Sequence, residues 1–186
     1  MNVPEKALKE YNIKVNVRDF EFINRDNFSE ITIKKNGLLS KEYTVLEGES
    51  VIGMLKHNPL TTQIYDTSGN VLLATIKKAE KHNHFDPKGI EKIREYLAED
   101  ATGNVFAKTV SEKAAHTIEL IYNVVDESGV IAKLVPPQKV FGKQEYYLYV
   151  YSQKLQPIML AALFLSIRMG EMDYANSVTM DAFYPF

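Results

Sequence analysis

The 186-residue sequence contains no cysteine, and its charges nearly cancel. The absence of cysteine excludes disulfides, thiolate metal ligands, cysteine nucleophiles, palmitoylation and prenylation. The net charge is −2 and the basic residues cluster only as pairs, Lys34-Lys35 and Lys77-Lys78, so we expect no nucleic-acid partner. The N-terminus has no apolar stretch of the kind that signal peptides carry, and we therefore expect a cytoplasmic protein.

Long apolar runs are also scarce, and the only one lies near the C-terminus. Residues 156–169 read QPIMLAALFLSIRM, so a helix here is apolar on every side. Such a helix is either buried in a core or inserted in a membrane. A membrane span needs roughly 17–25 residues, and this shorter run predicts a core helix over 156–170 and no transmembrane segment. A membrane anchor is the alternative, which purification without detergent would exclude.

The two ends of the chain carry shorter signals. Pro4 is followed by helix-forming residues, which predicts a short N-terminal helix or arm over 1–12. At the other end, Arg168 suits the last turn of the core helix and Gly170 suits its C-cap. Residues 173–186 then form a C-terminal tail that ends in the aromatic sequence AFYPF.

Most of the remaining sequence alternates between apolar and polar residues, which is typical of half-buried β-strands. The clearest segments lie at 13–17, 31–34, 43–46, 51–55, 63–65, 71–76, 105–107, 117–125 and 130–135. A last segment, EYYLYVYS at 145–152, places Tyr147, Tyr149 and Tyr151 on one face of a strand. At this length we expect the strands to form a single domain over 1–186.

One segment breaks the strand pattern. The dipeptide Asp86-Pro87 combines an N-cap residue with a proline suited to the first helical position. Ile90, Ile93 and Leu97 follow at the spacing of a helix face. The segment therefore predicts an additional amphipathic helix near 87–99.

Two turns repeat the same chemistry about sixty residues apart. Residues 64–74 (IYDTSGNVLLA) and 124–132 (VVDESGVIA) both read apolar-Asp-x-Ser-Gly followed by a strand. The aspartate side chain can accept hydrogen bonds from backbone amides in the turn, and the glycine can adopt a positive φ. We therefore expect two β-hairpins and not a pair of catalytic aspartates. They indicate either two related halves of one sheet or a chance match of common turn chemistry.

These hairpins, the tyrosine-rich strand and the terminal apolar helix together resemble the Tubby C-terminal-like superfamily. The LURP-one-like and phospholipid-scramblase-like branches are the most similar, and the resemblance covers about 43–172. It implies a closed antiparallel β-barrel of about twelve strands around the central hydrophobic C-terminal helix. A closed sheet must fill its lumen, and an apolar helix is a suitable filler. The predicted helix near 87–99 departs from the family pattern.

The resemblance also implies a function, a non-catalytic binding or scaffold module for a protein partner or an anionic phospholipid surface. The chain lacks the proline-rich region, the cysteine cluster and the acidic calcium-binding segment of scramblases. It has no clear match to the basic phosphoinositide-binding residues of Tubby, so no ligand-binding residue is transferred. We expect no cofactor, and the sequence contains no phosphate-binding glycine loop, nucleophile elbow or HExxH motif.

The alternative is an enzyme or metal-binding protein with a site assembled at one barrel mouth. His82 and His84 point to the same side of an extended strand, and Asp86 lies close by. Imidazole pairs suit zinc or nickel. The segment 77–84 is polar and rich in lysine, which is equally typical of a solvated loop. Elemental analysis of the purified protein distinguishes the two.

Overall fold

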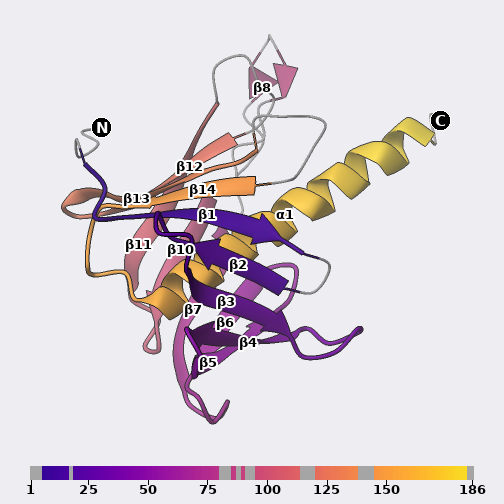
Figure 1. Cartoon of the computed structure of the whole chain (residues 1–186). Helices are drawn as coiled ribbons and strands as arrows, with labels where there is room; N and C mark the ends of the chain where they lie inside the picture. The colour runs from indigo at the N-terminus through magenta and orange to yellow at the C-terminus, as the bar shows by residue number, and fades with distance from the viewer. Residues whose placement is uncertain are drawn as a thin grey trace.

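The structure, a computed structural model, is a closed barrel of twelve antiparallel strands with one long helix in its lumen (Figure 1). It describes residues 6–16, 19–79, 85–86, 89–90, 95–113, 120–137 and 145–183. The barrel strands are β1 (Lys9–Val15), β2 (Asp19–Ile23), β3 (Ser29–Lys35), β4 (Glu42–Glu47), β5 (Ser50–His57), β6 (Thr61–Tyr65), β7 (Leu72–Ala79), β10 (Glu95–Asp100), β11 (Val105–Lys113), β12 (Leu120–Asp126), β13 (Gly129–Val135) and β14 (Glu145–Val150). The short strands β8 (Phe85–Asp86) and β9 (Gly89–Ile90) pair with each other outside the barrel, and α1 spans Pro157–Phe183.

Strands that are neighbours in the barrel follow one another along the chain, which makes it an up-and-down barrel. The first and last strands complete the circle, with Lys9 of β1 opposite Val150 of β14 and Ile13 opposite Tyr146. Because the sheet closes on itself, none of the twelve strands is left as an unpaired edge. The predicted closed barrel around a hydrophobic helix is therefore confirmed.

The alternating strand directions give the barrel two distinct ends. We call the end where α1 begins the entry end; it carries the β2–β3, β4–β5, β6–β7, β10–β11 and β12–β13 turns. The opposite end, where α1 leaves the lumen, is the exit end; it carries the β1–β2, β3–β4 and β5–β6 turns (Figure 1).

All five hairpins at the entry end share one construction. Each has a register shift near the turn and one turn residue with a positive φ: Asn27, Gly48, Gly69, Gly103 and Gly129. Register shifts increase local twist, which helps a sheet to close. In the β6–β7 turn, Asp66 Oδ1 accepts hydrogen bonds from the backbone N–H groups of Asn70 and Val71 at 3.1 and 3.2 Å. Both predicted Asp-x-Ser-Gly hairpins are confirmed, and their place among five similar turns favours common turn chemistry over two related halves.

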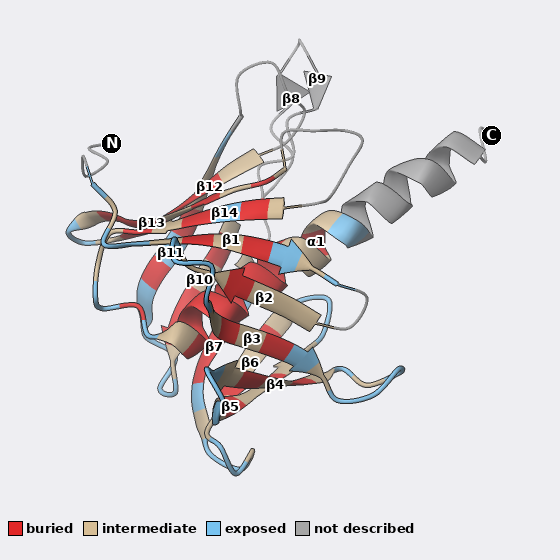
Figure 2. Cartoon of the chain, viewed as in Figure 1, coloured by how far each residue is buried: buried red, intermediate tan, exposed pale blue. Residues whose placement is uncertain are grey.

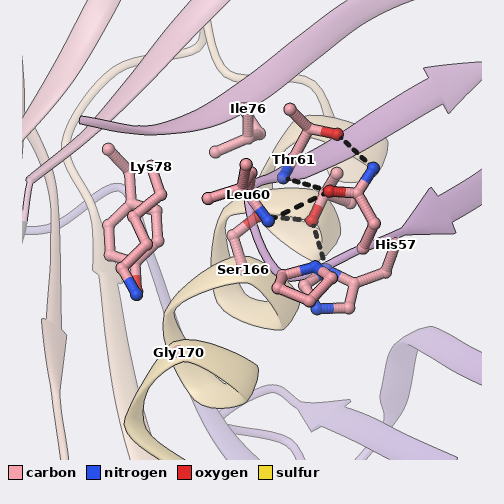
Figure 3. A pocket seen from close by; sticks show the side chains of 11 residues that line it. His57, Leu60, Thr61, Ile76, Lys78, Ser166 and Gly170 are labelled. Carbon is pink, nitrogen blue, oxygen red and sulfur yellow. Dashed lines mark hydrogen bonds between the residues drawn. The ribbon is translucent and has the colours of Figure 1, made fainter. Parts of the chain in front are cut away.

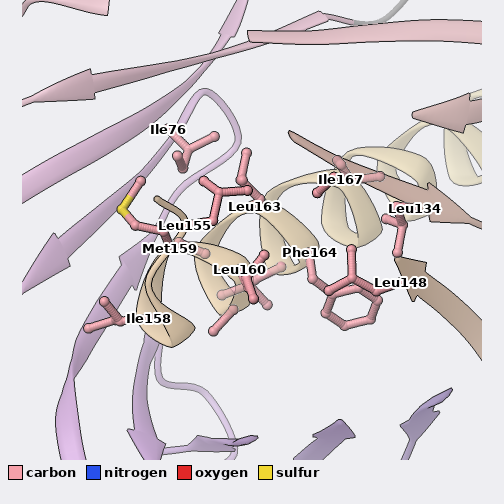
Figure 4. Packing of buried hydrophobic residues seen from close by; sticks show 14 of the residues in the cluster. Ile76, Leu134, Leu148, Leu155, Ile158, Met159, Leu160, Leu163, Phe164 and Ile167 are labelled. Atoms are coloured by element: carbon pink, nitrogen blue, oxygen red, sulfur yellow. The ribbon is translucent and has the colours of Figure 1, made fainter. Parts of the chain in front are cut away.

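The core forms between α1 and the inward side chains of the strands (Figures 2 and 4). Every residue of α1 from Ile158 to Ile167 is buried. The Phe164 ring makes edge-to-face contacts with Phe20, Phe22 and Tyr146, with ring centroids 5.3–5.4 Å apart. Each fully buried apolar side chain of this size contributes about 1.5–3 kcal/mol to stability.

The tyrosine-rich strand β14 has the two faces that its alternation predicts. Tyr146, Leu148 and Val150 are 2–5% exposed and face the helix, whereas Tyr147 is 43% exposed and lies on the outer wall. The outward tyrosines therefore belong to the surface of the barrel, and the inward residues to its core.

The predicted helix near 87–99 is wrong where the structure describes it. Residues 95–100 form strand β10, which pairs with β7 on one side and β11 on the other. Tyr96 and Ala98 point into the barrel, while Leu97 lies on the outer wall. The helical propensity of this segment is overridden because two neighbouring strands offer it a complete set of backbone hydrogen bonds.

The predicted chain ends also need correction. Residues 9–12 belong to β1 and not to a helix, because their backbone pairs with β14. At the other end α1 does not stop at Gly170 but continues to Phe183, so residues 173–183 of the predicted C-terminal tail belong to the helix. Gly170 is an interior helix residue whose ideal Cβ would lie within 3.0 Å of the Tyr96 hydroxyl. Its glycine allows close approach to β10 and does not serve as a C-cap.

Candidate functional site at the exit end of the barrel

A small pocket lined by both polar and apolar residues lies at the exit end, between the β5–β6 turn and α1 (Figure 3). It is lined by His57, Asn58, Pro59, Leu60, Thr61, Thr62, Ile76, Lys78, Tyr96, Ser166 and Gly170. Its free volume is about 10 Å3, which is close to the space that one water molecule needs. Pockets that enclose small-molecule ligands are usually about 300–1,000 Å3, so this pocket is too small for an organic substrate.

A chain of three hydrogen-bonding side chains runs from this pocket into the core. His57 Nδ1 lies 2.8 Å from Thr62 Oγ1, and Thr62 Oγ1 lies 2.7 Å from Ser166 Oγ. Thr62 is fully buried and Ser166 is 4% exposed. The same Ser166 hydroxyl lies 2.8 Å from the carbonyl oxygen of Ala162. The chain therefore ties β5, β6 and α1 together by polar contacts inside an otherwise apolar interior.

The hydrogen bonds among these three side chains can be donated in either of two directions. In the first, Ser166 donates to Thr62, and Thr62 donates to His57 Nδ1. In the second, Ser166 donates to the carbonyl of Ala162, Thr62 donates to Ser166, and a protonated His57 Nδ1 donates to Thr62. All three side chains keep a partner in both directions. The arrangement holds the helix in place and offers no exposed nucleophile, because the serine is buried.

A second polar cluster lies on another side of α1 at the same end. Tyr146 donates a hydrogen bond from its hydroxyl to Glu171 Oε2 at 3.0 Å, and the Arg168 guanidinium lies 5.7 Å from the centre of the Tyr146 ring. Burial raises the pKa of Tyr146, and the charge of Glu171 raises it further. Tyr146 therefore stays protonated and can keep donating this hydrogen bond over the whole physiological range.

One arc of this end, from β3 to β7, carries more lysines than acidic residues. We define the basic rim as residues 34–42, 56–61 and 77–78, which lie at the exit ends of the adjacent strands β3 to β7. The rim contains six lysines and one glutamate, a formal charge of +5: Lys34, Lys35, Lys41, Lys56, Lys77, Lys78 and Glu42. Lys56 pairs with Glu42 at 3.6 Å, and Lys77 pairs with Glu99 at 2.6 Å. Lys34 and Lys41 form no ion pair within the described part of the chain.

Three leucines stand out from the same rim. Leu39 is 93% exposed, Leu38 is 68% exposed and Leu60 is 60% exposed. Exposure of large apolar side chains to water is energetically unfavourable, and several of them grouped on one surface are unusual. The basic rim thus combines apolar tips with a positive border, although the whole protein has a net charge of −2.

The predicted metal candidates cannot be placed in this arrangement. His82 and His84 lie outside the described residues, and Asp86 is described only as part of β8. Across the described ranges, no group of three or more His, Asp or Glu side chains could hold a metal ion. The metal site therefore stays a prediction, and elemental analysis remains its test.

Sequence reasoning did not identify the basic rim or the hydrogen-bonded chain. The lysine pairs at 34–35 and 77–78 are 43 positions apart, and only the barrel brings the ends of β3 and β7 to one arc. The sequence contains one indication of the hydrogen-bonded chain. Ser166 is the single polar residue within the apolar run 158–167.

Comparison with known proteins reveals a similar fold. No family model and no curated protein matches the chain. A crystal structure of a protein from Arabidopsis thaliana is similar, with 10% sequence identity, a TM-score of 0.53 and coverage of 90% of this chain and 91% of that one. At this identity the likeness concerns the fold alone. Among the helices in the described ranges, none is long and apolar enough to cross a membrane.

Proposed function

We propose that this protein is a non-catalytic binding module of the Tubby C-terminal-like type, and that its basic rim docks on an anionic membrane surface. The observation that carries the proposal is the grouping of Leu38, Leu39 and Leu60 within a border of six lysines and one glutamate. Packed side chains fill the core between α1 and the strands, and this supports a function carried by the surface of the barrel.

The physical argument rests on two additive contributions. A lysine close to an anionic lipid surface contributes about 1 kcal/mol, and this attraction falls off within a Debye length. Leucine side chains that enter the boundary between headgroups and acyl chains bury apolar area and contribute about 1.5–3 kcal/mol each when fully buried. Neither contribution alone gives stable binding, and the rim supplies both from adjacent loops.

The direct test is co-sedimentation of the full chain with phosphatidylserine-containing vesicles at low salt. We expect binding that weakens as salt increases and that is lost on purely zwitterionic vesicles. The Lys34→Glu/Lys41→Glu variant should bind roughly 30-fold more weakly or worse. The matched control, Lys6→Glu/Lys108→Glu, makes the same charge change at exposed residues away from the rim and should bind like the unmodified protein.

The outcome separates lipid from protein partners. If the chain fails to bind anionic vesicles at low salt, the membrane proposal is wrong and the binding module must recognise a protein. If both double variants weaken binding equally, the attraction is a general charge effect and the rim is not the docking surface.

A further inference from the structure

The β3–β4 turn, which lies inside the basic rim, contains the dipeptide Asn36-Gly37. Both residues are exposed, and Gly37 has a φ of 120°. A Cβ built on Gly37 would meet a single atom within 4 Å, the Cβ of Ser40 at 3.9 Å. The space beside the Gly37 Cα is therefore open, with no side chain of its own and no closely packed neighbour there.

The Asn36 carboxamide is polarised by its surroundings. Thr44 donates a hydrogen bond from Oγ1 to Asn36 Oδ1 at 2.8 Å. A donor on a carbonyl oxygen draws electrons from the carbon and stabilises the negative charge that develops on that oxygen during nucleophilic attack. The backbone N–H of Asn36 donates to the carbonyl of Glu42 at 2.9 Å, which holds the residue at the start of the turn.

The β3–β4 turn also holds a positive charge. Lys35 donates a hydrogen bond from Nζ to the carbonyl oxygen of Leu38 at 3.0 Å, so its ammonium group lies within the turn. A nearby cation favours the deprotonated form of an N–H group. The Gly37 N–H now donates to the carbonyl of Lys35 at 2.9 Å, and this bond must break before the nitrogen can react.

We propose that Asn36 is a site of spontaneous deamidation within the basic rim. The Gly37 backbone nitrogen loses its proton to water and forms a bond to Asn36 Cγ. The carboxamide C–N bond then breaks, and the departing nitrogen takes a proton from water and leaves as ammonia. Water then opens the resulting succinimide ring to give aspartate or isoaspartate at position 36. No oxidant or enzyme is needed, since the reaction consumes one water and releases one ammonia.

The modification changes the charge of the rim. It adds one carboxylate beside Lys34 and Lys35, which lowers the formal charge of the rim by one unit. This consequence rests on the proposed membrane function and predicts weaker binding to anionic vesicles, whereas the reaction itself does not depend on any function. The turn would then act as a slow, irreversible modulator of docking.

The reaction is tested by incubating the purified full chain at mildly alkaline pH and mapping its peptides by mass spectrometry. Asn70 and Asn104 are internal controls, because each precedes a β-branched valine in an exposed turn of the same barrel. We expect Asn36 to convert roughly tenfold faster or more than these two, since glycine offers the attacking nitrogen without a side chain. Equal rates at the three asparagines would overturn the proposal.

Two variants test its parts separately. Thr44→Val removes the hydrogen bond to Asn36 and should slow the reaction roughly 2- to 10-fold, whereas a faster reaction would show that the hydrogen bond protects the turn. Asn36→Asp reproduces the charge of one product and should bind anionic vesicles more weakly than the unmodified chain. If Asn36 is deamidated but the Asn36→Asp variant binds vesicles like the unmodified chain, the deamidation is confirmed and its proposed effect on docking is wrong. If the unmodified chain binds no vesicles, only the proposed membrane function is contradicted.

Discussion

The hydroxyl oxygen of Tyr96 occupies the place where a side chain on Gly170 would begin. An ideal Cβ on Gly170 lies closer than 3.0 Å to this oxygen, a separation that real Cβ atoms essentially never show. Tyr96 is on β10 and Gly170 is inside α1, so the pair sets how closely the helix lies against this part of the barrel wall.

Gly170→Ala should therefore destabilise the protein, although alanine is the better helix former by about 1 kcal/mol. We expect a net loss of about 1–3 kcal/mol because the helix or the Tyr96 ring must shift. Adding Tyr96→Phe removes the oxygen that collides and leaves the ring carbon beyond it at 3.3 Å. Urea unfolding should show that the double variant is more stable than Gly170→Ala, with Tyr96→Phe alone as the control. An additive double variant would mean that the two residues are not coupled.

The helix is expected to be the main stabilising element of the barrel. Phe164→Ala removes a ring that is 1% exposed and contacts three other aromatic rings, so it should lower the free energy of unfolding by about 3–5 kcal/mol. Met172→Ala, at a residue of the same helix that is 42% exposed, should change stability by less than about 0.5 kcal/mol. Comparable losses in the two variants would contradict the role of α1 as a filled core.

The Thr62–Ser166 contact should be energetically coupled. Thr62→Val and Ser166→Ala each remove one hydroxyl from a buried pair 2.7 Å apart. Each single variant leaves its former partner with fewer hydrogen bonds, which costs about 1–3 kcal/mol. The double variant should lose less than the sum, by about 1 kcal/mol, in chemical denaturation. A sum that is fully additive would show that the hydroxyls act independently.

Stability should fall in acid partly through Asp126. The hydrogen bond from Lys154 at 2.8 Å, followed by that from the Ser128 hydroxyl, lowers the pKa of the Asp126 carboxyl to about 2. An unfolded aspartate has a pKa of about 3.9. The folded value is the lower one, so the contribution is fully present above about pH 4 and is lost as the pH falls towards about 2.

Urea unfolding of the unmodified chain and of Asp126→Asn, compared between roughly pH 6 and pH 2, checks this prediction. This is the range set by the two pKa values. The variant should be less stable near neutral pH, and the difference should shrink as the pH falls. Asp26→Asn, at an exposed residue of the β2–β3 turn, should keep the pH dependence of the unmodified chain. A constant difference between Asp126→Asn and the unmodified chain would contradict the assignment.

The strands and the core helix could be predicted because their signals are local. In β14, alternate residues face the helix, and a period of two in the sequence reports that directly. The run from Ile158 to Ile167 is apolar on all sides, and every one of its residues is buried. The prediction for segment 95–100 was wrong because it also relied on a local signal. The spacing of its apolar residues suits a helix, but pairing with β7 and β11 makes it a strand.

The sequence by itself determined that this chain is a mainly β protein with a hydrophobic helix in its core, because hydrophobic periodicity is a local property of the sequence. Only the tertiary structure decided which distant residues meet. Sheet closure brings six lysines and three leucines from separate turns to one rim, and it seats Ser166 against Thr62, 104 positions away along the chain. These contacts depend on strand order and register. Both are set by the pairing between strands and are not encoded in the local sequence.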